Sequence, residues 1–295
     1  MKLFTFNDGK RLKLGINTEK GLLDLTKVLQ SFPNPSVPQT MEQLIAGGET
    51  HLQELESFVN RILKEVADEC FLREEETVFG PCVPNPGKII CVGLNYRKHA
   101  VESNMRIPEY PVLFNKFDNS ISAHKEVIPI PYNAEQIDYE AELVMVIGKK
   151  AKQVAKKNAL DYVLGYCNGN DLSVRELQFR TNQWLLGKTS DGFCPIGPYL
   201  VTADEIENPN NLDMKTYVNR EIRQNSNTAD MIFHCDELIS YISHYMALNP
   251  GDIIMTGTPE GVILGYPKED QHWLKSGDEM VIEISGLGRL INQLG

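Results

Sequence analysis

The chain has 295 residues, 42% of them hydrophobic and 23% charged, and this balance is typical of a globular protein with a well-formed core. The formal net charge is -11 at pH 7. Because nucleic-acid binding needs clustered lysine and arginine, this charge argues against DNA and RNA as partners. No apolar run reaches membrane-spanning length, so we expect no membrane insertion. The six cysteines form no CxxC pair, which predicts reduced thiols and a cytoplasmic protein.

Residues 1–80 predict a small α+β domain. The segments "KLFTF" and "RLKLGI" have the pattern of strands, and two amphipathic helical segments follow them. Thr40 and Thr50 each stand three residues before a glutamine, which is the spacing of a capping box at the start of a helix. Three prolines within residues 81–87 then indicate a linker between this domain and the rest of the chain.

Residues 88–295 predict a larger domain made mostly of short strands, such as "KIICVGL", "ELVMVIG", "GPYLVT" and "MVIEIS". Glycine and proline turns separate these strands, and only two or three helical segments lie among them. This order favours a β-sandwich or roll over a doubly wound parallel sheet. We therefore expect an α+β protein with a mostly β second domain.

The segment "DYEAELVMVI", residues 138–147, predicts a strand with an unusual face. Because side chains alternate along a strand, Asp138, Glu140 and Glu142 share one face, which continues into Val144 and Val146. Neighbouring carboxylates near a core repel one another and resist the loss of water. The face is therefore either a solvated edge or one whose charge is compensated, for example by a cation.

The segment "GYCNGNDLSVRELQ" favours the second interpretation. Ser173 and Glu176 have capping-box spacing, so we expect Ser173 to start a helix and to leave Asp171 available for another role. Glu140, Glu142 and Asp171 would then form an all-oxygen ligand set, which suits Mg²⁺ or Mn²⁺. Asp138 on the same face is expected to be an outer or structural acid.

The segment "VGLNYRKHAVE" runs from a strand into a predicted helix, on which His99 and Glu102 lie three residues apart on one face. One interpretation is a surface ion pair. The other is a general base with an orienting carboxylate, in which Glu102 holds the imidazole so that it accepts a proton near neutral pH.

Further candidates are polar residues near these segments, each of which has a solvated alternative. Lys188 stands in the glycine-containing loop "LLGKTSDG", where functional residues concentrate. Arg175 and Gln178 share a helix face and are placed to bind a substrate carboxylate. The remaining candidates for substrate contact are Lys116, Gly257 and Thr258.

Together these stretches resemble the fumarylacetoacetate hydrolase superfamily, particularly its acylpyruvate hydrolase and oxaloacetate decarboxylase branch. The resemblance runs in order through "VGLNYRKHAVE", "PVLFNK", "DYEAELVMVIG", "GYCNGNDLSVRELQ", "QWLLGKTSDGFCPIGP", "NTADMIF" and "PGDIIMTGTPEGV". It covers residues 86–295, whereas residues 1–80 match only an accessory extension found in some members. In one departure, the hairpin "TYVNREIRQNSNT" has Arg220 where relatives often have glycine.

The resemblance implies a mixed β-roll that is commonly a homodimer and a site with assigned roles. Metal binding falls on Glu140, Glu142 and Asp171, with Mg²⁺ or Mn²⁺ as the usual ion. Catalysis falls on His99 and Glu102, which activate water, and on Lys188, which faces the reacting oxygen. Substrate binding falls on Lys116, Arg175, Gln178, Gly257 and Thr258.

The function implied is a divalent-metal-dependent hydrolase that cleaves a C–C bond of small 2-oxo acids, such as acylpyruvates or fumarylpyruvate, through a stabilised pyruvate enolate. Because the same enolate serves other reactions, two alternatives stay open. The chain is otherwise an oxaloacetate decarboxylase, or an isomerase or tautomerase of a related 2-oxo diacid. A binding subunit without catalytic activity is the remaining alternative.

Overall fold

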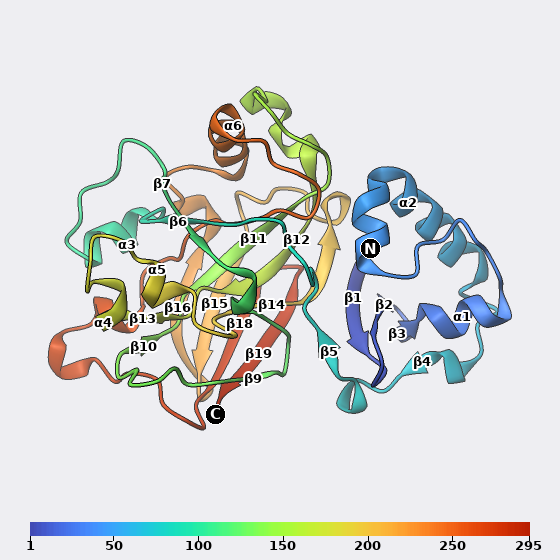
Figure 1. Ribbon diagram of the computed structural model, residues 1–295, viewed down its shortest axis with the longest axis horizontal. Helices are drawn as coiled ribbons and strands as arrows, with labels where there is room; N and C mark the ends of the chain where they lie inside the picture. The colour runs from blue at the N-terminus through green and yellow to red at the C-terminus, as the bar shows by residue number, and fades with distance from the viewer.

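The computed structural model describes residues 1–295 and is organised around one large mixed sheet (Figure 1). This sheet has 12 strands, and the antiparallel pair β11 and β12 lies in its interior. In spatial order its main path contains β4 (Phe71–Leu72), β3 (Gly21–Asp24), β2 (Leu12–Thr18), β1 (Lys2–Asn7), β14 (Cys194–Thr202), β12 (Val163–Asn170), β11 (Ala141–Ile147), β17 (Ile253–Met255), β6 (Ile89–Gly93) and β7 (Val112–Lys116). Two short strands complete it, β5 (Phe79–Gly80) beside β1 and β8 (Ile121–Ser122) beside β14.

Two smaller sheets and six α-helices complete the fold. The five-stranded sheet has the order β16 (Glu221–Asn227), β15 (Asp213–Val218), β18 (Glu279–Ile284), β19 (Gly288–Leu294) and β9 (Val127–Ile128). A two-stranded sheet joins β10 (Ile137–Asp138) to β13 (Ser173–Val174). The α-helices are α1 (Leu25–Ser31), α2 (Met41–Ile62), α3 (Arg97–Glu102), α4 (Arg175–Gln178), α5 (Leu185–Lys188) and α6 (Cys235–Tyr245). The predicted α+β class with a mixed β core is confirmed.

The first 80 residues add strands to the sheet that carries the acidic residues. Strand β1 is antiparallel to β14, with Leu3 opposite Leu200, and Figure 1 shows α1 and α2 grouped with β1 to β4 at one end of the molecule. A single core cluster includes Leu44 of α2 together with Val144 and Val146 of β11. Residues 1–80 and 88–295 therefore share sheet and core, and their division into two domains remains a prediction from sequence.

Strand β11 explains why the acidic segment runs into an apolar stripe. All seven of its residues are buried. Leu143 and Met145 pack in the cluster that includes Ile282 of β18, whereas Val144 and Val146 pack in the cluster on the opposite face. The face shared by Glu142, Val144 and Val146 is thus internal, which rules out the solvated-edge interpretation.

Two predictions about local structure in the first 80 residues had different outcomes. Thr40 is the N-cap of α2 and accepts a hydrogen bond from the backbone N–H of Gln43, as its spacing predicted. The predicted helix start at Thr50 is wrong, because Thr50 lies inside α2 and the only break in that helix is at Gly48. Gly48 has φ of 55°, which a residue without a side chain adopts readily.

The Arg220 turn keeps the geometry that glycine usually provides. Asn219 and Arg220 both have positive φ, 50° and 73°, between the paired strands β15 and β16. Positive φ at both central residues is the requirement of a type I′ hairpin turn. The substitution at this position therefore leaves the shape of the turn intact.

Two observations bear on the environment of the chain. None of the helices combines the length and apolar character needed to cross a bilayer. All six cysteines are buried free thiols, which agrees with the prediction of reduced cysteines.

Buried His124 makes the stability of the fold depend on pH. Its Nδ1 accepts the backbone N–H of Ile291, and burial, followed by the charge of Lys125, lowers its pKa to about 4. Because this pKa is depressed in the folded state, the stabilisation is present above the unfolded pKa of about 6.5 and is lost as the pH falls towards 4. We expect the free energy of unfolding to fall by about 2 to 3 kcal/mol over this range.

Urea unfolding at a series of pH values measures this loss. His124→Asn keeps an acceptor near Nδ1 and should remove most of the pH dependence, whereas His244→Asn, at an exposed position, should leave it unchanged. An unaltered slope in His124→Asn would contradict the assignment.

Candidate active site

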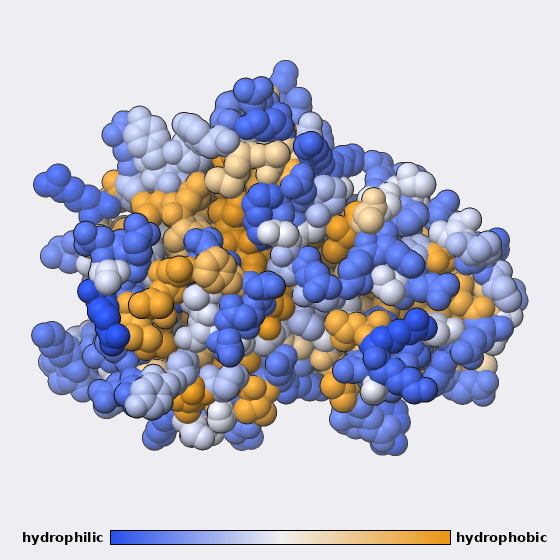
Figure 2. All heavy atoms as spheres, in the orientation of Figure 1, coloured by the Kyte–Doolittle hydropathy of each residue, from blue (hydrophilic) through white to orange (hydrophobic).

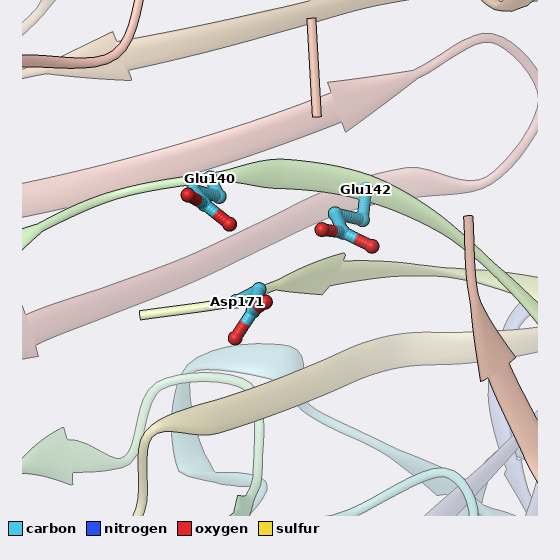
Figure 3. A group of neighbouring side chains, drawn as sticks. All are labelled: Glu140, Glu142 and Asp171. Carbon is cyan, nitrogen blue, oxygen red and sulfur yellow. The ribbon is translucent and has the colours of Figure 1, made fainter. Parts of the chain in front are cut away.

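The three predicted metal-binding acids converge on one buried space. Glu140 directly precedes β11, Glu142 lies within it, and Asp171 directly follows β12 (Figure 3). The register of these antiparallel strands, with Ala141 opposite Asn170, places the acids side by side. One oxygen from each carboxylate lies within 4.8 Å of the others, and all three residues are buried.

Three buried cations hold the acids in place. Lys188 at the end of α5 donates to Oε2 of Glu140 at 2.7 Å and to Oδ2 of Asp171 at 2.8 Å. Arg175 of α4 contacts Oε1 of Glu140 at 2.7 Å, and Lys116 at the end of β7 contacts Oδ1 of Asp171. Glu142 has no cation of its own and accepts the backbone N–H of Gly257 at 2.7 Å.

The pKa shifts follow this unequal pairing. Burial opposes the ionisation of Glu140, but the charges of Lys188 and Arg175 outweigh it and hold the pKa of Glu140 well below its usual range. Burial, followed by the charges of Asp171 and Glu140, raises the pKa of Glu142 well above its usual range. Of the three acids, Glu142 therefore most needs a further positive charge nearby.

The donor set fits a hard divalent cation. Asp138, Glu140, Glu142 and Asp171 are four buried carboxylates, and Lys116, Arg175 and Lys188 are three buried cations, so full ionisation leaves one net negative charge. A divalent cation would change this to one net positive charge, which suits an anionic ligand. Carboxylate oxygens have two lone pairs each, so those already bonded to lysine or arginine keep capacity for a metal.

His99 and Glu102 form the predicted dyad on α3. Nδ1 of His99 lies 2.8 Å from Oε1 of Glu102, so the carboxylate holds the ring proton on Nδ1 and leaves Nε2 as an acceptor. The backbone N–H of Gly261 donates to both oxygens of Glu102, at 3.2 and 3.0 Å. A Cβ at Gly265 would lie 2.6 Å from Cδ of Glu102, so only glycine leaves room for this carboxylate.

The dyad and two of the acids line one cavity of about 390 Å³. Its polar lining includes His99, Glu102, Glu140, Glu142 and Lys188. Its apolar wall includes Val92, Phe114, Phe179, Trp184 and Leu264. Figure 2 shows apolar side chains gathered on the face where β6, β7 and α5 lie. The cavity thus combines a charged end with an apolar wall.

Helix α4 carries two of the predicted substrate-binding residues, but its start differs from the prediction. The capping box at Ser173 and Glu176 is wrong: Val174 is the N-cap, and the Ser173 hydroxyl donates to the carbonyl of Asp171. Glu176 instead accepts backbone N–H groups from residues 135 and 136 of a separate segment. This long-range contact replaces the local cap.

The predicted substrate-binding residues occupy different positions relative to the cavity. Arg175, Gln178 and Thr258 line it, and Gly257 reaches it through its hydrogen bond to Glu142. Lys116 is fully enclosed and directed to Asp171, so the geometry gives it a part in fixing that carboxylate. Substrate contact by all five residues remains a prediction.

The sequence alone did not identify Gly261, Gly265, Phe114 or Trp184 as part of the site. The two glycines were visible in the loop "TGTPEGVILG", whose spaced glycines are the only local signal. Asp138 matches its predicted structural role, since it accepts hydrogen bonds from Arg175 and from the backbone N–H groups of Ile263 and Leu264.

Comparison with known proteins agrees with this geometry. The profile described as Fumarylacetoacetate (FAA) hydrolase C-terminal matches residues 88–295. The chain belongs to the fumarylacetoacetate hydrolase family. It is 39% identical over 293 residues to oxaloacetate tautomerase fahd2, mitochondrial, of Xenopus laevis, covering 98% of this chain and 88% of that protein. It is 42% identical to the fumarylacetoacetate hydrolase domain-containing protein 2 homolog of Dictyostelium discoideum, covering 100% of this chain and 97% of that protein.

Solved structures of family members have the same fold. Fumarylacetoacetate hydrolase from Exiguobacterium antarcticum is 31% identical, with a TM-score of 0.81 and coverage of 100% of this chain and 99% of that chain. Maleylpyruvate hydrolase from Sphingobium sp. SYK-6, in complex with manganese(II) ion and pyruvate, is 30% identical, with a TM-score of 0.79 and coverage of 100% and 98%. The prediction that this family member is an enzyme is confirmed.

A divalent cation should stabilise the folded protein through the acidic cluster. Ligand at about 100 times its dissociation constant adds about 2.7 kcal/mol to the free energy of unfolding, which for a chain of this size corresponds to a rise of several degrees in Tm. We expect Mg²⁺ or Mn²⁺ to raise Tm of the chelator-treated protein, as measured by calorimetry.

Glu142→Gln should reduce this rise strongly because it removes a ligand charge. Glu279→Gln, an exposed acid on β18, is the matched control and should retain the full rise. An equal response of Tm in both variants would place the ion elsewhere.

Proposed function

We propose that the enzyme interconverts the enol and keto forms of oxaloacetate or of a closely similar small 2-oxo diacid. The observation that carries the proposal is that the His99–Glu102 pair and the buried acids face the same cavity. Such an arrangement combines a proton-transfer group with a site for negative charge on a 2-oxo oxygen. The name of the Xenopus laevis relative supports this reaction over the C–C hydrolysis that the sequence favoured.

Glu140, Glu142 and Asp171 would hold Mg²⁺ or Mn²⁺, and the manganese in the maleylpyruvate hydrolase complex supports this choice. When bound, the ion supplies Lewis-acid stabilisation of negative charge at the 2-oxo oxygen. Lys188, whose pKa is raised by Asp171 and Glu140 although its burial opposes this, is protonated and adds a positive charge beside the same oxygen. Arg175 and Gln178 are positioned to orient a substrate carboxylate.

His99 performs the proton transfer in this proposal. In the enol-to-keto direction C3 of the substrate gains a proton and the C2 hydroxyl loses one. Nε2 of His99 is the atom that takes up or delivers the C3 proton, because Nδ1 is engaged by Glu102. Glu102 keeps the ring in one orientation and stabilises its protonated form, while Gly261 holds Glu102.

His99→Gln should lower kcat for oxaloacetate tautomerisation by about 100-fold or more, because it removes the general base and leaves the acids in place. The loss of ultraviolet absorbance of the enol in metal-supplemented buffer measures the rate, and calorimetry checks that metal affinity is unchanged. His244→Gln is the matched control at an exposed histidine and should retain full activity. Full activity in His99→Gln would refute the assignment of the base.

Hydrolysis of acylpyruvates is the second candidate, and the apolar cavity wall favours it. Phe114, Phe179 and Trp184 extend the cavity beyond its charged end, where an acyl tail would fit. The same dyad would then activate water for attack on the distal carbonyl. The structural similarity to a maleylpyruvate hydrolase supports this candidate.

A substrate panel separates these reactions. Oxaloacetate, acetylpyruvate and fumarylpyruvate incubated with the Mg²⁺-supplemented enzyme give different products by NMR. We expect accelerated tautomerisation of oxaloacetate without release of pyruvate. Pyruvate from oxaloacetate would instead indicate the decarboxylase alternative, and pyruvate from an acylpyruvate would indicate the hydrolase.

A further inference from the structure

Gln224 of β16 is a buried side chain with every hydrogen-bonding position occupied. Its Oε1 accepts the backbone N–H of Ala141 at 3.0 Å and the hydroxyl of Thr216 at 2.7 Å. Its Nε2 donates to Oγ1 of Thr258 and to the carbonyl of Pro259, both at 2.9 Å. An amide has two donor hydrogens and two acceptor lone pairs, so this residue has no capacity left for a ligand.

Two backbone groups fix the orientation of this amide. The Ala141 N–H can only donate, so the atom beside it must be the amide oxygen. The Pro259 carbonyl can only accept, so the atom beside it must be the amide nitrogen. The amide nitrogen therefore also faces Thr258.

This orientation determines what the Thr258 hydroxyl can do. Because Oγ1 of Thr258 accepts a hydrogen from Gln224, its own hydrogen must point in another direction. Thr258 lines the cavity, and no group of the protein accepts that hydrogen. The hydroxyl is thus prepared to donate to an anionic oxygen of a ligand.

The other end of the same amide holds the acidic strand. Ala141 lies between Glu140 and Glu142, and its backbone N–H is the group that Gln224 accepts. One side chain therefore connects the strand that carries two acids with the loop that carries Thr258.

We propose that Gln224 is a positioning residue that aims the Thr258 hydroxyl at a carboxylate or enolate oxygen of the substrate. The proposal rests on the 2-oxo acid chemistry proposed above and adds a residue that does not contact the substrate. It predicts that the effect of changing Gln224 on ligand binding acts through Thr258.

A double-mutant cycle on the Mg²⁺-loaded enzyme tests this dependence. Oxalate is a suitable probe, because it is an unreactive planar dianion with oxygens placed like those of a 2-oxo acid enolate, and calorimetry gives its Kd. Thr258→Val removes the hydroxyl while keeping the shape and should raise this Kd by about 10-fold or more. Gln224→Glu keeps an acceptor for the Ala141 N–H but turns the Thr258 hydrogen towards the new carboxylate, and should raise Kd similarly.

The decisive quantity is the effect of Gln224→Glu in the Thr258→Val background. It should be at least about 5-fold smaller there than in the wild type, because the hydroxyl through which Gln224 acts is already absent. Equal effects in both backgrounds would overturn the proposal. Gln224→Met, which is neutral and of similar length, provides the same comparison without an added charge.

Thr216→Val is the matched control. It removes the other hydroxyl bonded to Gln224, but Thr216 does not line the cavity and the two backbone groups still fix the amide. Oxalate affinity should stay unchanged, and a loss equal to that of Thr258→Val would contradict the proposal.

The result is separable from the proposed reaction. Oxalate binding with the expected coupling but no oxaloacetate turnover would refute the tautomerase function and keep the role of Gln224. Turnover with equal effects in both backgrounds would do the reverse.

Discussion

The site depends on a buried cluster in which four carboxylates meet three cations. Any one of these charges alone would be costly to bury, and removing a partner from such a cluster typically destabilises a protein by about 3 to 5 kcal/mol. Lys188 contacts two acids at once, and Arg175 joins Glu140 to Asp138. The positions of the metal-binding acids are thus set by their counter-charges as well as by strands β11 and β12.

A single loop after β17 connects this cluster to the proton-transfer pair. Its backbone N–H groups donate to Glu142 from Gly257, to Glu102 from Gly261 and to Asp138 from Ile263. The acids, the dyad and the structural acid behind Arg175 therefore all refer to one rigid piece of chain. This arrangement accounts for the close packing at the loop glycines, where a side chain would collide with its neighbours.

Sequence reasoning reached the residues whose placement follows from local geometry. Strand alternation put Glu140 and Glu142 on one face, and helix periodicity put His99 beside Glu102. It failed where contacts between distant segments decide the structure. Ser173 gave up its predicted cap because Glu176 binds the chain near residue 135, and Gly261 reaches Glu102 across 159 positions of sequence. No pattern within a short window carries such information.

The pairing of β1 with β14 has a consequence for the first 80 residues. Strand β14 is joined on one side to β12, which leads into Asp171, and on the other side to β1. Without the N-terminal strands, the backbone groups of β14 that β1 now pairs would be a bare sheet edge beside Leu200 and Ile196, and such edges recruit strands from other molecules. The extension thus acts as a built-in guard against aggregation of the catalytic sheet.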